Sequence, residues 1–348
     1  MTDARPAHDA RIWLYAFGYF ACYWPYSALT KLASQGRIPG MTRAVSGFEL
    51  LPVTTIASLV GMLVFLSWRG LFRYATHRTV LGRVIPVPTR WTFLSGVATA
   101  VIIATTTLAY TFDGVSIVLM MLLMRGGVLV LAPFVDAWSG RRVRMVSWIA
   151  LGLSLASLAV TLADGARYDM TWVASVDVAA YLASYFVRLR FMSHLAKSED
   201  PRDTYRYFVE EQMVATPAVV FLLVVGAVIG KGAALEELRA GFLSLGGTGA
   251  LLPAIAIGLL SQGTGVFGAL ILLDGRENAF CVPVNRASSV LAGVLASATL
   301  ALLGLGQATP MSEVAGAGLV LSAIVVLAWP TLAARRRAGQ ASTARPAG

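Results

Sequence analysis

Long apolar stretches alternate with short polar segments along the whole chain. Ten of the stretches have about the 20 residues that a helix needs to cross a bilayer. They lie at residues 12–32, 46–67, 91–110, from a tight turn at 113–114 to 133, and at 145–163, 171–187, 210–229, 251–273, 280–303 and 314–332. A short interfacial helix is expected at 235–242. The pattern predicts an all-α integral membrane protein with ten transmembrane helices.

The charged residues are few and unevenly placed. Of the 348 residues, 57% are hydrophobic and 13% are charged, a composition too apolar for a soluble domain. With ten spans, 20 of the 28 Lys and Arg residues fall on the side that holds both termini and 6 on the other. The positive-inside rule then places both termini in the cytoplasm and the protein in a plasma membrane, with a bacterial inner membrane as the expected location.

The two remaining cations, Arg125 and Arg286, lie inside apolar spans and belong to a repeated pattern. An Asp-Gly turn begins at Asp113 and again at Asp274, and each is followed by an arginine 12 residues after the aspartate. The two patterns are 161 residues apart. This interval indicates that the chain contains one structural unit twice.

Other positions repeat at nearly the same interval. Tyr19 and Tyr23 recur as Tyr181 and Tyr185, and Glu49 recurs as Glu210. A unit of five spans is odd, so its second copy must enter the membrane from the opposite side, which produces an inverted repeat. We therefore expect two inverted five-helix repeats at 12–163 and 171–332, a cytoplasmic tail at 1–11, and a basic, disordered tail at 333–348.

Both arginines are expected near the middle of the bilayer. Twelve residues of helix advance about 18 Å, and half of the hydrocarbon core is about 15 Å. A lone charge there costs at least about 2.5 to 3.5 kcal/mol, so each arginine needs a partner, a cavity or a ligand. Arg125 and Arg286 could together clamp an anionic substrate, since guanidinium groups bind carboxylate, phosphate and sulfate in bidentate geometry. The alternative is internal pairing with Asp177, Glu49 or Glu210.

The remaining candidate substrate-binding residues are aromatic or carry an amide. Tyr19, Tyr23, Tyr181 and Tyr185 could line a cavity, or they could serve ordinary packing or an interfacial aromatic belt. Gln262 and Asn285 could donate or accept hydrogen bonds from a substrate, or could bond between helices.

Glu49 and Glu210 are candidates for carrying a coupling proton. The alternative is that each lies in a first helical turn, where an acidic residue complements the helix dipole or caps the helix. No metal or other cofactor is expected. The three histidines, His8, His77 and His194, are scattered, and the two cysteines give no ligand spacing.

The ten spans in two halves, with a tight hairpin between the third and fourth spans and between the eighth and ninth, resemble the drug/metabolite transporter superfamily with its EamA-type repeat. The resemblance covers about residues 12–332. It implies a central cavity lined by the first, third, fourth, sixth, eighth and ninth spans, and movement of metabolites by exchange, export or ion coupling. The chain differs from common members in its two midplane arginines, where many members have small or apolar residues.

The sequence thus predicts a secondary transporter of the drug/metabolite type that moves a small metabolite, with an anion as the candidate class, by alternating access. The expected partners are a small-molecule substrate and the lipid bilayer, with a homodimer as a candidate assembly and no nucleic acid. Catalysis is not expected, because the chain lacks an Asp-rich metal site and a Ser-His pair. A lipid flippase or lipid-processing protein of the same architecture and a non-transporting membrane subunit are the alternatives.

Overall fold

The computed structural model describes residues 5–80, 82–108, 117–162, 171–198, 200–305 and 311–343. Within these ranges the chain forms eleven α-helices. They are α1 (Arg5–Ser34), α2 (Gly47–Trp68), α3 (Arg90–Leu108), α4 (Ile117–Trp138), α5 (Met145–Leu162), α6 (Trp172–Phe191), α7 (Pro201–Ile229), α8 (Ala233–Leu243), α9 (Leu251–Leu272), α10 (Asn278–Leu302) and α11 (Met311–Thr343). The fold is mostly helical, and each of the ten predicted stretches contains one long helix.

Four helices in the described part of the chain, α2, α7, α9 and α10, are long and apolar enough to cross a membrane. Shorter apolar segments lie within α5 and α11. Large apolar side chains, among them Trp68 and Val228, are exposed on the outside of the bundle. Such a surface is typical of a membrane protein, because lipid tails rather than water cover it.

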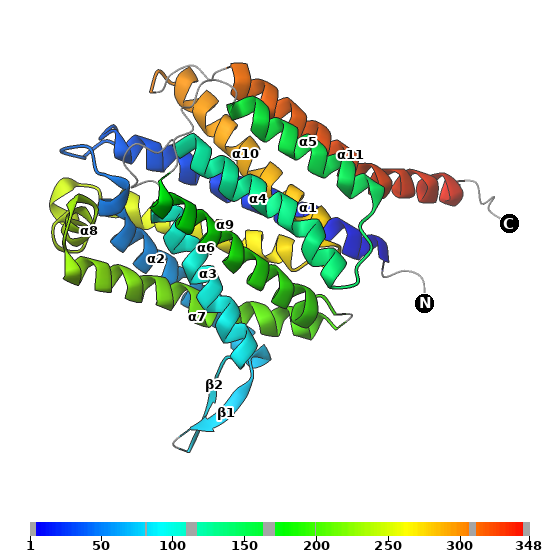
Figure 1. The fold of residues 1–348 in the computed structure, drawn as a ribbon, viewed down its shortest axis with the longest axis horizontal. Helices are drawn as coiled ribbons and strands as arrows, with labels where there is room; N and C mark the ends of the chain where they lie inside the picture. The colour runs from blue at the N-terminus through cyan, green and yellow to red at the C-terminus, as the bar shows by residue number, and fades with distance from the viewer. Residues whose placement is uncertain are drawn as a thin grey trace.

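The helices form one elongated bundle, whose two ends differ (Figure 1). The start of α1 and the end of α11 lie at one end, and α8 lies at the other. We call the end that holds α8 the α8 end, and the end with the start of α1 and the end of α11 the opposite end. The short helix expected at 235–242 is α8, which packs against α2 and α7.

The packing between helices follows the same scheme in both halves of the chain. Helix α1 packs against α9 and α10, and α6 packs against α3 and α4. In the same way α2 packs against α9, and α7 against α3. Helices α3 and α9 begin 161 residues apart, as do α4 and α10. Helices α5 and α11 lie side by side along one edge of the bundle (Figure 1).

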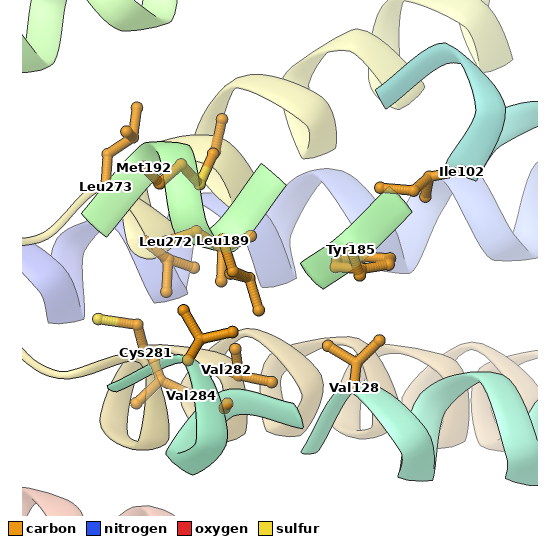
Figure 2. Close-up of a cluster of buried hydrophobic side chains, with 14 of the residues drawn as sticks. Ile102, Val128, Tyr185, Leu189, Met192, Leu272, Leu273, Cys281, Val282 and Val284 are labelled. Carbon is orange, nitrogen blue, oxygen red and sulfur yellow. The ribbon is translucent and has the colours of Figure 1, made fainter. Parts of the chain in front are cut away.

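The largest hydrophobic core joins the two halves at the centre of the bundle. Tyr185 and Leu189 of α6 face Val128 of α4 and Val282 of α10 in this core (Figure 2). Close packing of this kind fixes the rotation of each helix about its axis. It therefore decides which side chains point toward the centre.

The segment between α2 and α3 differs from the all-α expectation. It contains a 3₁₀ turn (Leu71–Tyr74) and an antiparallel hairpin of β1 (His77–Val80) and β2 (Arg83–Pro86), in which His77 pairs with Pro86. The hairpin projects away from the bundle (Figure 1). Five arginines lie between the predicted spans 46–67 and 91–110, and charge alone does not distinguish a loop from a short exposed hairpin.

The connection between the two halves is shorter than the sequence predicts. Helix α6 continues to Phe191 and passes into a π-helical turn (Met192–Ala196). Helix α7 begins at Pro201, where the Asp200 carboxylate accepts a hydrogen bond from the Arg202 backbone N–H. Proline at this position fits a helix start because its missing N–H would have no partner there.

These boundaries correct the placement of two residues. Arg188, which directly follows the predicted span 171–187, lies inside α6, and Glu210 lies in the interior of α7 rather than in its first turn. At the chain ends, α1 begins at Arg5 and α11 continues to Thr343, so helix extends into both segments expected to be tails.

Candidate functional site

Arg286 lies among tyrosine hydroxyls at the centre of the bundle. It is eight residues after the first residue of α10, about 12 Å along the helix. Its Nη2 donates hydrogen bonds to the hydroxyl oxygens of Tyr185 (2.9 Å) and Tyr181 (3.3 Å). Its guanidinium carbon lies 5.3 Å from the centre of the Tyr185 ring, within cation–π range. Its Nε is buried without a hydrogen-bond partner.

Arg125 occupies the equivalent position on α4, eight residues after Ile117. The Tyr19 and Tyr181 hydroxyls each interact electrostatically with both Arg125 and Arg286. Since α4 also packs against α10, the two arginines converge on one cluster of tyrosines. Within the described ranges, no carboxylate lies within 4.0 Å of either guanidinium group.

The tyrosines of α1 form a stack beside this cluster. The Tyr19 and Tyr23 rings are nearly parallel, with centres 5.6 Å apart. Gly268 of α9 permits the approach of Tyr19, because a Cβ atom at this glycine would lie 2.9 Å from the Tyr19 ring and 3.2 Å from Asn285 Nδ2. Tyr19 and Tyr23, which are four residues apart, therefore lie on one face of α1.

The tyrosines of α6 are also adjacent, with ring centres 4.9 Å apart. Tyr181, Tyr185 and Asp177 are all buried and follow one another at intervals of four residues. Residues at this spacing share a helix face. One face of α6 therefore carries an acid at the α8 end and two phenols that bind Arg286 further along.

The two amide residues have different surroundings. Asn285 is buried next to Tyr19 and Gly268, and its Nδ2 lies 3.5 Å from the Gly268 carbonyl oxygen, a long hydrogen bond. Gln262 accepts a hydrogen bond from Ser58 Oγ (2.8 Å) at the contact between α2 and α9, and its Nε2 has no partner. Asn285 thus belongs to the tyrosine cluster, whereas Gln262 forms its hydrogen bond between α2 and α9.

The three acids that could have paired with the central arginines do not do so. Glu49 lies in the first turn of α2 and binds Arg43 through two hydrogen bonds, one of 2.9 Å from Nη1. Asp177 is buried, and neither carboxylate oxygen has a hydrogen-bond partner.

Glu210 holds the two ends of the β-hairpin segment against α3. Its carboxylate accepts hydrogen bonds from the backbone N–H groups of Thr76 (2.8 Å) and Thr89 (3.0 Å) and from the Thr92 hydroxyl (2.6 Å). The bond from Thr89 satisfies an N–H at the start of α3, so Glu210 caps a neighbouring helix. This arrangement favours a structural role over proton coupling, since the carboxylate is saturated with donors.

A buried ion pair was not found by the sequence analysis. Arg188 of α6 donates to Glu211 of α7 through Nε (2.8 Å) and Nη2 (3.1 Å), and the Ser95 and Thr99 hydroxyls also donate to this carboxylate. The available signal was an acid at Glu211, inside an apolar segment. Its partner was missed because Arg188 falls just outside the predicted span 171–187.

Polar contacts close the opposite end of the bundle. The Asp136 carboxylate accepts hydrogen bonds from the backbone N–H groups of Asn278 and Ala279, at the start of α10. Nearby, Lys197 donates from Nζ to the Arg276 carbonyl oxygen at 2.7 Å. The turn that begins at Asp274 is thus fixed to α4 and to the segment between α6 and α7. The related turn at Asp113 lies outside the described residues.

Glu277 strengthens the same closure. It accepts hydrogen bonds of 2.7 Å from Arg144 Nε and from Ser147 Oγ of α5. Burial alone would raise the pKa of the Glu277 carboxyl, but these hydrogen bonds hold it below its ordinary value.

Comparisons with known proteins identify the fold and no function. No family model matches the chain, and no curated protein matches it. A solved structure, described only as the crystal structure of a protein, is similar with a TM-score of 0.55 and 15% sequence identity. The similarity covers 94% of this chain and 98% of that one. At this identity the chain shares its overall fold with a protein of similar length, and nothing about activity follows.

Proposed function

We propose that this protein is a secondary transporter that binds a small anion between Arg125 and Arg286 and moves it across a membrane by alternating access. The observation that carries the proposal is the convergence of two guanidinium groups, without carboxylate partners, on the same tyrosines. A buried cation without a counter-charge is costly, and at membrane depth it is a functional-site candidate by default. An anion would supply the missing charge.

The chemistry of the cluster favours an oxyanion. Arg286 retains an unpartnered buried Nε, and guanidinium groups bind carboxylate, phosphate or sulfate through paired N–H donors. Tyr181 and Tyr185 orient the Nη2 edge of Arg286. We infer that Tyr19 and Asn285, which pack together against Gly268, complete the wall of the binding site.

The packing of the two halves supports an inverted repeat of five helices each. The contacts of α1 with α9 and α10 correspond to those of α6 with α3 and α4. In this arrangement Arg125 and Arg286 are equivalent residues whose helices enter from opposite sides of the membrane. A site between two such halves can be exposed to either side in turn.

Anion counterflow in proteoliposomes tests the proposal. The purified protein is reconstituted and loaded with unlabelled sulfate, phosphate, lactate or glutamate, and uptake of the labelled anion is measured. We expect counterflow of at least one of these anions. Arg125→Gln and Arg286→Gln should each lower its apparent affinity about tenfold or more, because a hydrogen bond to a charged group contributes about 1.5 to 3 kcal/mol.

Arg142→Gln is the matched control, because Arg142 is exposed in the connection between α4 and α5. It removes the same charge and should leave affinity unchanged. The proposal fails if none of the anions is exchanged and none raises the thermal stability of the protein. Normal affinity in both central variants would also contradict the assigned site.

A further inference from the structure

Asp177 is a buried acid without any partner that explains its burial. Only 4% of its surface is exposed, and both carboxylate oxygens lack hydrogen-bond partners. It lies five residues after the first residue of α6, on the face that carries Tyr181 and Tyr185. No charged group of the described residues contacts it.

The ionisable groups on the neighbouring helices face elsewhere. Helix α3 contributes only Arg90, at its first residue and thus at the opposite end of the bundle. Helix α4 contributes Arg125, which interacts with Tyr181, and Asp136, which caps α10. From α10, Arg286 binds the two tyrosines of α6. None of these groups forms a hydrogen bond or an ion pair with Asp177.

An ionised carboxylate in such surroundings is strongly disfavoured, because it has lost its hydration without gaining donors. It must carry a proton or meet a cation. A metal ion would need several oxygen ligands, and no group of three or more candidate ligand residues occurs in the described part of the chain. A proton requires only the one carboxylate, so the surroundings of Asp177 favour a proton.

The position of Asp177 links it to the central arginines. One helical turn, about 6 Å, separates it from Tyr181 in the direction of the α8 end. The opposite end is held by the contacts of Asp136 and Lys197. Asp177 therefore lies between the tyrosine cluster and the first turn of α6.

We propose that Asp177 is a proton-binding site and that one proton on this carboxylate travels with each anion held by Arg125 and Arg286. The second half of this inference rests on the proposed function. An anion on the arginines favours the protonated carboxyl, since like charges disfavour a second negative group nearby. When the anion leaves, the two uncompensated arginines weaken proton binding at Asp177, and the proton is released once the site is open to that side. Proton and monovalent anion together carry no net charge.

Infrared spectroscopy tests the protonated state without any substrate. At neutral pH the wild type should show the C=O absorption of a protonated carboxyl, and Asp177→Asn should lack that component. Asp177→Glu, which keeps a titratable group, should retain it. Glu236→Gln, at an exposed acid of α8, is the control and should match the wild type. Identical carboxyl absorption in the wild type and Asp177→Asn overturns the proton site.

Transport measurements test the coupling. With a pH gradient of one unit, acidic on the side from which the anion enters, a monovalent anion carried with one proton accumulates up to about tenfold. We expect Asp177→Asn to lower the ratio of accumulation to counterflow about tenfold, and Glu236→Gln to leave this ratio unchanged. An unchanged ratio in Asp177→Asn overturns the coupling. If the wild type exchanges no anion, the proposed function fails, while the infrared result still decides the protonation of Asp177.

Discussion

Two arginines inside the bundle, Arg188 and Arg286, should respond differently to the same substitution. Arg188 is paired with Glu211, and their side chains are 9% and 0% exposed. Arg286 binds two neutral tyrosine hydroxyls and lies over the Tyr185 ring. Replacing each arginine with methionine removes a cation while keeping an unbranched apolar side chain. The comparison therefore separates an arginine that stabilises the fold from one that is retained for a ligand.

The expected magnitudes follow from these contacts. Arg188→Met leaves the Glu211 carboxylate buried with only the hydroxyl donors Ser95 and Thr99, and breaking a buried ion pair in this way costs about 3 to 5 kcal/mol. Arg286→Met removes the cost of a midplane arginine, about 2.5 to 3.5 kcal/mol. It also removes two hydrogen bonds of about 1.5 to 3 kcal/mol each, of which the 3.3 Å bond is the weaker. At the lower end of this range the two bonds together contribute about 3 kcal/mol, which is close to the cost that is removed.

Thermal unfolding in detergent without added anion measures the difference. Arg188→Met should lower Tm by about 5 to 10 °C, and Arg286→Met should change it by no more than about 3 °C. Added anion should then raise Tm in the wild type and in any folded Arg188→Met protein, but not in Arg286→Met. If Arg286→Met loses as much stability as Arg188→Met, Arg286 is a structural residue and the reasoning is wrong.

Three further predictions concern stability. The pKa of Glu277 is lower in the folded protein than its ordinary value of 4.5. The stability that Glu277 contributes is therefore complete above pH 4.5 and is lost as the pH falls through the folded pKa. Glu277→Gln should reduce the acid-induced loss of Tm, whereas Glu236→Gln should not. Gly268→Ala should lower stability by about 1 to 3 kcal/mol by displacing Tyr19 or Asn285, whereas Gly265→Ala, with nothing within 4 Å, should be neutral or stabilising in thermal unfolding. Glu210→Gln should speed trypsin cleavage in the β1–β2 hairpin, because an amide nitrogen cannot accept the hydrogen bond from Thr89 N–H; unchanged cleavage would contradict the role of Glu210 as an anchor.

The positions of the helices could be predicted because burial in lipid leaves a strong signal. Each long apolar stretch became a helix, and the start of α10 follows the start of α4 by the interval between Arg125 and Arg286. The β1–β2 hairpin could not be predicted in this way. Its strands are short and exposed, and the interaction that anchors it comes from Glu210, more than a hundred residues away in the chain.

The central residues were identifiable from the sequence, but their partners were not. A charge inside an apolar span needs a partner, so Arg125 and Arg286 could be identified as candidate site residues. The spacing along the chain could not show whether Asp177 would pair with them. In the structure Asp177 forms no hydrogen bond with either arginine, whereas Tyr181 binds Arg286. Arg188 was misassigned because basic residues near a span end indicate a loop, and only the position of Glu211 on α7 shows that it is buried.

The most direct test of the account is an experimental structure determined with the anion that gives the strongest counterflow. The account predicts one anion bound by the guanidinium groups of both Arg125 and Arg286, beside the hydroxyls of Tyr19 and Tyr181. An anion bound elsewhere, or arginines that face lipid or form separate ion pairs while the anion is present, would contradict it.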